Sequence, residues 1–173
     1  MGLRRLALLP FLLTLSPACA RDESRGMSLS SAAFARGAAI PKRHTCDAED
    51  LSPPLAWAGV PAGTLSFAVV VDDPDAQNFT HWLLFDIPAA AVSLPEGVRS
   101  GNLPKGAREG ANDFGSTGYG GPCPPGGRHR YSFRVYALDV PTLTPPPATK
   151  EQFETAIRKH ALARAELIGT YQR

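Results

Sequence analysis

The sequence has few cysteines, no long apolar run and almost no net charge. Its three cysteines and four histidines form no C-x-x-C pair and no clustered metal-ligand spacing, which leaves a structural zinc site with little support. Of its 18 Lys and Arg residues, Arg4 and Arg5 lie in the first twenty positions, so the rest of the chain balances its 16 Asp and Glu residues. This neutrality argues against a nucleic-acid partner.

Catalytic motifs are missing as well. The sequence contains no Gly-x-Ser-x-Gly elbow, no His-Glu-x-x-His pair and no phosphate loop ending in Gly-Lys-Ser/Thr. Cys123 lies between two prolines, but it has no marked base partner and a disulfide would occupy it. We therefore favour a binding protein with no enzymatic activity, cofactor or metal. The alternative is a hydrolase of a phosphorylated or ester substrate that uses histidine and aspartate, with or without a metal ion.

The composition indicates a mainly β protein of one domain. The 173 residues are 43% hydrophobic and 20% charged, as in an ordinary globular domain. The 16 glycines and 17 prolines disrupt helix interiors and favour many turns between short strands.

The first twenty residues are typical of an export signal. Two arginines precede an apolar run at 6–15, which is shorter than the ~20 residues of a membrane-spanning helix, and small residues follow it. Cleavage at Ala18-Cys19-Ala20 and lipidation of Cys19 are two outcomes that the pattern leaves open. We expect 1–20 to be a secretory or lipoprotein signal and 21–173 to fold as one domain in the periplasm or outside the cell. A lipid anchor would be its only membrane contact.

Export places the two remaining cysteines, Cys46 and Cys123, in an oxidising compartment. A bridge between them would close a loop of 77 residues and contribute roughly 4 kcal/mol by restricting the unfolded chain. Two separately buried thiols are the alternative. We favour the disulfide.

Strand signals precede a helical signal along the chain. Apolar runs or apolar–polar alternation predict three strands, at 65–72, 81–87 and 131–139, and two weaker ones, at 29–34 and around Val92. The Gly- and Pro-rich segment 101–127 lacks periodicity, so we expect a functional loop beside a site. Apolar residues recur every three or four positions over 153–168, after a Thr149–Gln152 capping box and before Gly169. These signals predict a β-sandwich with short flanking helices and a C-terminal amphipathic helix.

Aspartates and histidines lie where the predicted strands begin and end. Asp73 and Asp75 follow the first strand, His81 opens the second, and His129 comes directly before the third. Turn formation is the structural alternative for the aspartates, and a packed, hydrogen-bonded ring is the alternative for each histidine. Their combination in one short chain favours convergence on a pocket.

In this combination the chain resembles the phosphatidylethanolamine-binding protein family, in particular its bacterial Raf-kinase-inhibitor-like branch. The resemblance runs in order from about residue 28 to the end. The segments that carry it are Ser52-Pro53-Pro54-Leu55 with Trp57, Asp73-Pro74-Asp75-Ala76, His81-Trp82, Asn112-Asp113-Phe114-Gly115, Gly121-Pro122-Cys123-Pro124-Pro125, His129-Arg130-Tyr131, Tyr136-Ala137-Leu138-Asp139 and Gly169-Thr170-Tyr171. Gln77 departs from the family, which commonly has a proline there.

The resemblance implies a β-sandwich with a small pocket for phosphate-like anions or phospholipid head groups. Because the family includes enzyme inhibitors, it also implies an unidentified protein partner. The pocket positions that carry over are Asp73, Asp75, His81, Gly121, His129, Tyr131 and Tyr171.

Elementary chemistry indicates how such a pocket would hold an anion. The backbone N–H groups of Gly120 and Gly121 are not shielded by a Cβ atom. The two aspartates would orient the two histidines and hold them protonated, so that charge-assisted donors face the ligand. We therefore expect anion binding to strengthen below about pH 7.

Overall fold

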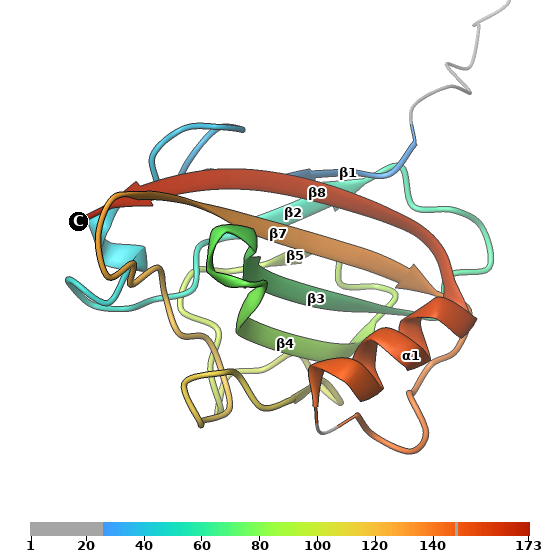
Figure 1. Cartoon of the computed structure of the whole chain (residues 1–173). Coiled ribbons are helices and arrows are strands. Elements are labelled where there is room, and N and C mark those ends of the chain that lie inside the picture. Colours follow the sequence, from blue (N-terminus) through green and yellow to red (C-terminus); the bar gives the residue numbers. More distant parts are fainter. Residues whose placement is uncertain (1–25, 148) are drawn as a thin grey trace, which may run out of the picture.

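Within residues 26–147 and 149–173, which the computed structural model describes, eight strands form two sheets and one α-helix covers the larger sheet (Figure 1). The smaller sheet has the order β1-β2-β5 and the larger sheet β6-β4-β3-β7-β8. The elements are β1 (Ser28–Ser30), η1 (Lys42–His44), β2 (Leu55–Ala58), β3 (Ser66–Asp73), η2 (Pro74–Ala76), β4 (Phe79–Pro88), β5 (Ser93–Leu94), β6 (Arg108–Glu109), β7 (Arg128–Leu138), α1 (Lys150–His160) and β8 (Ala161–Gln172). The predicted signal at 1–20, with Cys19, lies outside the described residues.

The three strands with the strongest sequence signals form the middle of the larger sheet. Strands β3, β4 and β7 agree with their predicted positions within three residues at each end. Every residue of β3 is buried, because the strand is paired on both sides and covered on both faces. This explains why its sequence is a continuous apolar run. The weaker signals correspond to the short strands β1 and β5. Strands β2 and β6 had no predicted counterpart, and β6 lies within the segment 101–127 that was expected to be a loop.

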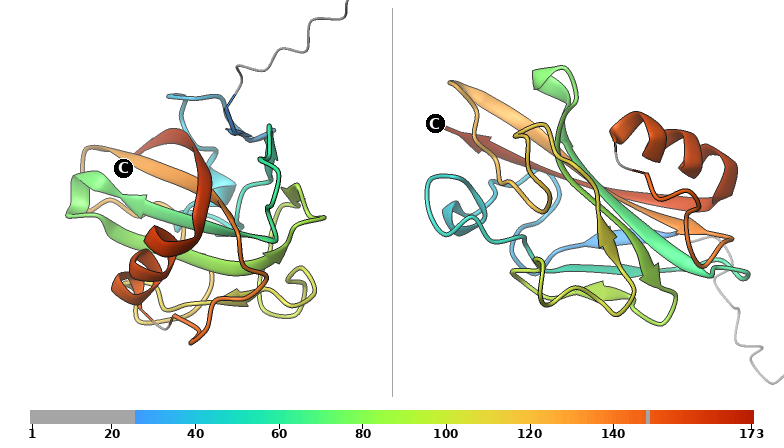
Figure 2. Two further views of the ribbon diagram at one scale, coloured as in Figure 1. Left: turned by 90° about the vertical axis from the view of Figure 1, so that its right-hand side faces the viewer. Right: turned by 90° about the horizontal axis from the view of Figure 1, so that it is seen from below.

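The larger sheet separates two hydrophobic cores. One core lies between the two sheets, and the other lies between the larger sheet and α1. Figure 2 shows the smaller sheet and α1 on opposite sides of the larger sheet. Strand β7 contributes alternate residues to each: Tyr131 and Phe133 belong to the first core, and Tyr136 and Leu138 to the second. The predicted alternation in this strand is therefore confirmed, and consecutive side chains serve different sides of the sheet.

The predicted C-terminal helix is correct only in its first half. Helix α1 begins after Thr149, whose hydroxyl accepts a hydrogen bond from the Gln152 N–H, and it ends at His160. The continuation expected to Ile168 is instead strand β8, which pairs with β7 along its length. In this segment Ala165 and Leu167 are buried, whereas their neighbours Glu166 and Ile168 are only half-buried. Burial therefore alternates with the two-residue period of a strand. Tertiary pairing thus overrides the helical propensity of the Ala-, Leu- and Arg-rich segment.

Gly169, which was predicted to end the helix, lies within β8, where the lack of a side chain permits close packing. A Cβ atom there would lie 2.6 Å from Ile40 Cγ1 and 2.8 Å from Phe34 Cε2. The segment around Ala39 also pairs in parallel with Thr170. An N-terminal segment is thereby packed against the end of β8.

A disulfide joins Cys46 to Cys123. It links the loop after η1 to the Gly- and Pro-rich loop before β7. The carboxylate of Asp47, next to the bridge, accepts hydrogen bonds from the Tyr171 hydroxyl at 2.7 Å and from Arg173 Nε at 3.2 Å. Three segments that are distant in sequence therefore meet at one end of the larger sheet.

Among the described residues, no helix has the length and apolarity that crossing a membrane requires.

Candidate functional site

A cavity of about 140 Å³ lies at the end of the larger sheet where β3 ends and β7 begins, near the C-terminus marked in Figure 1. The residues that line it come from β3, η2, β4, β7 and the loop before β7. They are Asp73, Ala76, Phe79, His81, Phe114, Cys123, Pro124, Pro125 and Tyr131. Three of the predicted site residues, Asp73, His81 and Tyr131, are therefore brought together here.

Asp73 is held at the cavity by the turn that it caps. Its Oδ1 accepts hydrogen bonds from the backbone N–H groups of Asp75 at 2.9 Å and Ala76 at 3.1 Å, which starts η2. Its Oδ2 lies 2.7 Å from Nδ1 of His129. Since a carboxylate accepts, we assign the proton to that ring nitrogen. His129 thus lies beside the cavity and is oriented by Asp73, as the sequence predicted.

His81 lies in the cavity wall but has no aspartate partner. Its Nδ1 is 2.7 Å from the carbonyl oxygen of Gly120, and because a carbonyl only accepts, Nδ1 carries the proton. Burial lowers the pKa of His81, and this outweighs the Gly120 carbonyl and Asp73, both of which favour the charged ring. The expectation that aspartates keep His81 protonated is therefore wrong. In the neutral ring, Nε2 is an acceptor until an arriving ligand favours its protonation.

Aromatic rings enclose the His81 imidazole on several sides. The ring centroids of Phe79, Phe114 and Tyr131 lie 5.3, 5.2 and 5.2 Å from its own, each in an edge-to-face arrangement. Phe114 is 48% exposed, so part of its ring forms the rim of the cavity. These apolar neighbours supply the desolvation that disfavours the charged imidazole.

Tyr131 contributes a hydroxyl that stays protonated beside Asp73. Its side chain is fully buried and lines the cavity, and the hydroxyl makes no hydrogen bond of good geometry with the described residues. Burial and the interaction with the Asp73 carboxylate raise the pKa of Tyr131, so the hydroxyl keeps its proton. It is therefore a donor whose hydrogen bonding with its neighbours is incomplete.

Asp75 belongs to a surface ion pair and does not orient either histidine. It accepts hydrogen bonds from Arg130 through the backbone N–H at 2.9 Å, Nε at 3.0 Å and Nη2 at 2.6 Å. These bonds lower the pKa of Asp75 to about 2. Its predicted role in orienting a histidine is replaced by this contact, because Arg130 points to the opposite side of β7 from His129.

Neither glycine N–H group of the predicted anion cradle is free. The Gly120 N–H donates to the His81 carbonyl at 3.0 Å, and the Gly121 N–H donates to Asp50 Oδ1 at 2.7 Å. A Cβ atom on Gly121 would also lie 2.5 Å from the carbonyl oxygen of His44. Gly121 is thus required by close packing behind the cavity wall, and the cradle predicted from sequence is wrong.

Tyr171 pairs with His129 across β7 and β8, but its hydroxyl donates to Asp47 and its side chain does not line the cavity. The prediction from sequence missed the aromatic and proline wall formed by Phe79, Phe114, Pro124 and Pro125. Three of these four lie in the loop that was predicted to border a site, so loop composition carried part of the signal.

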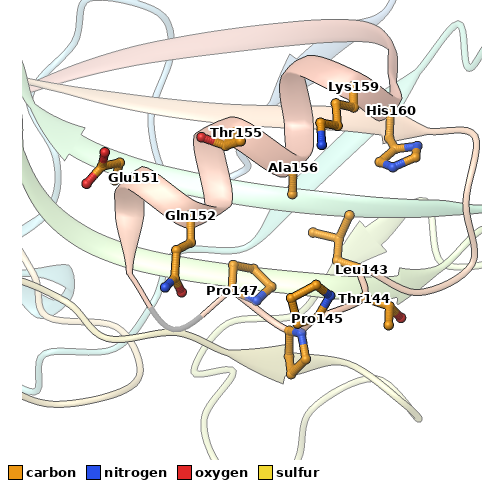
Figure 3. Close-up of a pocket in the computed structure, with 11 residues that line it drawn as sticks. Leu143, Thr144, Pro145, Pro147, Glu151, Gln152, Thr155, Ala156, Lys159 and His160 are labelled. Atoms are coloured by element: carbon orange, nitrogen blue, oxygen red, sulfur yellow. The ribbon is translucent and has the colours of Figure 1, made fainter.

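Two other kinds of site, a metal centre and a larger cavity, have less support among the described residues. No group of three or more His, Cys, Asp or Glu side chains in that part of the chain is arranged to hold a metal ion. A larger cavity of about 640 Å³ lies between α1 and the segment 143–147 (Figure 3). Its walls include three consecutive prolines, and none of the predicted site residues lines it. The smaller cavity is therefore the better candidate, because it gathers the predicted site residues and the larger cavity does not.

Comparison with known proteins decides the family. A family model described as "Phosphatidylethanolamine-binding protein" matches residues 30–172. The chain belongs to this family. The predicted resemblance and the mainly β sandwich with flanking helices are thereby confirmed.

The similarity extends over nearly the whole length of several relatives. A UPF0098 protein of Methanothermobacter thermautotrophicus is 49% identical over 150 residues, covering 85% of this chain and 99% of the relative. A UPF0098 protein of Aquifex aeolicus is 45% identical over 152 residues, covering 85% and 89%.

Solved structures of the family share the fold. Escherichia coli YbcL, described as a member of the mammalian PEBP family, superposes with a TM-score of 0.81 at 33% identity, covering 86% of this chain and 99% of YbcL. The PEBP homologue CT736 of Chlamydia trachomatis gives a TM-score of 0.78 at 38% identity, covering 87% and 99%.

Proposed function

We propose that this protein is a non-enzymatic binding protein for small phosphate-like anions or phospholipid head groups, and that it binds them in the cavity of Asp73, His81 and Tyr131. The observation that carries the proposal is the convergence of Asp73, His81 and Tyr131 on one cavity, in which the Tyr131 hydroxyl makes no hydrogen bond of good geometry with the described residues. A ligand oxygen would accept from this hydroxyl once the hydroxyl turns away from Asp73. Family membership supports the same class of function.

Proton uptake on His81 would make the cavity receptive to an anion. In the free protein the neutral ring offers a lone pair at Nε2, beside the carboxylate of Asp73. An anion therefore binds best when Nε2 gains a proton and donates to it together with the Tyr131 hydroxyl. Binding and protonation are then linked, and each favours the other.

The lining of the cavity favours binding over covalent catalysis. It includes no serine, threonine or lysine, and its one cysteine forms the disulfide with Cys46. His129 and Asp73 form a hydrogen-bonded pair of the kind that activates a hydroxyl or thiol nucleophile, but no serine, threonine or free cysteine lies among the lining residues. A hydrolase would have to activate a water molecule there, and a screen against phosphate esters and carboxylate esters tests that alternative.

We also propose that the folded part of the chain works outside the cytoplasm. The Cys46–Cys123 disulfide supports this, because such bridges persist mainly in oxidising compartments. Detection of the protein in the periplasmic or culture fraction would test it, and retention in the cytosol would contradict it.

Calorimetric titration with phosphate and with phosphoethanolamine tests the binding site. We expect Tyr131→Phe to weaken binding about tenfold or more, because one hydrogen bond to a charged ligand contributes ~1.5–3 kcal/mol. Tyr119→Phe is the matched control, since it removes a hydroxyl that donates to the His44 carbonyl at 2.8 Å and lines neither this cavity nor the one beneath α1. Equal affinities of the wild type and Tyr131→Phe would contradict the proposal.

A further inference from the structure

A second cavity, of about 230 Å³, lies on the opposite side of the larger sheet between α1 and strands β7 and β8. Three arginines from three elements line it: Arg134 of β7, Arg158 of α1 and Arg164 of β8. We propose that this cavity is a second anion site, which binds a tetrahedral oxyanion such as sulfate or the phosphate group of a larger molecule. The proposal does not depend on the function proposed for the first cavity.

Strand register brings two of the arginines to the same face. Arg164 lies directly opposite Tyr136, and Arg134 lies two residues before Tyr136 on the same strand. Side chains two residues apart on a strand, and those opposite each other on paired strands, share one face of a sheet. Helix α1 covers this face (Figure 2) and adds Arg158 from above the sheet.

The arginines retain donors that the described residues do not use. Arg134 binds Asp72 through Nη2, but its Nε is buried and has no hydrogen-bond partner among the described residues. Arg158 uses one nitrogen, Nη2, to donate to Thr155 Oγ1 at 2.9 Å. The guanidinium of Arg164 has no hydrogen bond or ion pair within the part of the chain that the structure describes. The exposed guanidinium groups of Arg158 and Arg164 can donate directly to an oxyanion in the cavity. Arg134, held by Asp72, adds its charge beside them.

The charge balance at this cavity also favours an anion. Among the lining residues, three guanidinium groups face one carboxylate, that of Glu154. Asp72 is shared between Arg134 and Lys150, whose Nζ lies 3.4 Å from Asp72 Oδ2. Glu166 lies directly opposite Arg134 on the same face and is the nearest further carboxylate along β8, where it accepts a 2.5 Å hydrogen bond from Ser132. No ion pair with a described residue holds Arg158 or Arg164, so these two guanidinium groups carry the excess positive charge.

The apolar part of the wall strengthens the attraction. Val70, Phe153 and Ile157 line the cavity and belong to the core beneath α1. A lower local dielectric near such side chains increases the interaction between a bound anion and the guanidinium groups. The arginines stay charged at any physiological pH, so this site needs no proton uptake.

The test is a titration of the protein with sodium sulfate at pH 6.5, followed through the Nε–H signals of the arginines in ¹H–¹⁵N NMR spectra. We expect the Arg134 Nε–H signal to shift and to reach saturation. In Arg158→Ala/Arg164→Ala, the apparent affinity should fall about tenfold or more, as expected when charge-assisted hydrogen bonds are lost. Both substituted residues are exposed, so the fold should be retained.

Two further variants make the outcome decisive. Tyr131→Phe impairs only the first cavity and should leave the Arg134 response unchanged, so failure of one site is distinguishable from failure of the other. Arg99→Ala removes an arginine that lines neither of the two cavities and should also have no effect. An Arg134 signal that does not saturate, or that responds equally in the double variant, would overturn the proposal.

The same titration identifies the source of the oxyanion. Inorganic phosphate and glycerol 3-phosphate offer the same group, free or as an ester. Tighter binding of the ester would show that the cavity takes the phosphate group of a larger molecule, and equal binding would show that the free ion suffices.

Discussion

The two cavities lie on opposite sides of one sheet and differ in how they would attract an anion. The first surrounds a buried imidazole with aromatic rings beside a carboxylate, so its positive charge depends on a proton. The second is lined by three guanidinium groups whose charge is permanent. Strand β7 supplies both, since Tyr131 faces one side and Arg134 the other. Strand β7 therefore contributes to one cavity whose affinity for an anion should depend on pH and to another whose affinity should not.

Their structural supports differ as well. The first cavity is bounded by loops that are tied together by the disulfide and by hydrogen bonds to Asp47 and Asp50. The second depends on how α1 packs against the sheet through Phe153 and Ile157. Changes to the loops should therefore affect the first site, and changes beneath the helix should affect the second.

The largest effect should come from removing the aromatic ring beneath the helix. Phe153 is fully buried, so Phe153→Ala should lower the free energy of unfolding by about 3–5 kcal/mol. It should also weaken sulfate binding at the second cavity while the first keeps its affinity. Urea denaturation and the sulfate titration measure the two effects.

Phe114→Ala is the matched control for that experiment. Because Phe114 is half exposed at the rim of the first cavity, its truncation should cost much less stability and weaken only the first site. If Phe153→Ala weakened both cavities equally, the two sites would not have separate supports.

A smaller loss of stability is expected when the disulfide is removed. Cys46→Ser/Cys123→Ser should lower the free energy of unfolding by about 2–4 kcal/mol and reduce phosphoethanolamine affinity, because Cys123 lines the first cavity. The wild-type protein treated with a reductant should behave in the same way. Sulfate binding at the second cavity should be unchanged, and a parallel loss there would contradict the separation.

The smallest effect, and the sharpest contrast, concerns pH. Groups that face the first cavity are His81, Asp73 with its partner His129, and Tyr131, and burial lowers the pKa of His81. A bound anion raises that pKa, so affinity should rise as pH falls, by at most about tenfold per pH unit for one proton. This gain in affinity should be lost as pH rises through the pKa that His81 has in the complex.

Sulfate is the suitable probe, because it stays a dianion between pH 5 and 8. Calorimetry should show proton uptake on binding to the first cavity, whereas the second should keep its affinity over the same range. A flat profile at the first cavity would disprove the role of His81.

Much of the first site could be predicted from the order of residues. Asp73 ends an apolar strand and His81 begins the next one, and adjacent antiparallel strands bring such positions together. The Gly- and Pro-rich loop beside them was also predicted to border a site. Motif resemblance added Tyr131, which lines the cavity.

The roles of individual groups could not be predicted in the same way. Asp75 pairs with Arg130, and the Gly121 N–H is taken by Asp50, which lies 71 positions earlier in the chain. Such partners depend on how loops pack, and no local pattern identifies them. The second cavity was even harder to predict from the sequence, because its three arginines come from three different elements. One of these elements, β8 with Arg164, was predicted to be helical.

The apolar runs of β3 and β4 and the apolar–polar alternation of β7 were sufficient to predict the centre of the fold, because a strand covered on both faces is apolar throughout and side chains of a strand alternate between its faces. The segment 161–172 has helical composition as well as a two-residue period, so local preference left its structure open. Pairing with β7 resolved it, since eleven residues of that strand find partners in β8. Only this long-range pairing could place Arg164 beside Arg134, because local sequence preferences contain no information about which strands become neighbours.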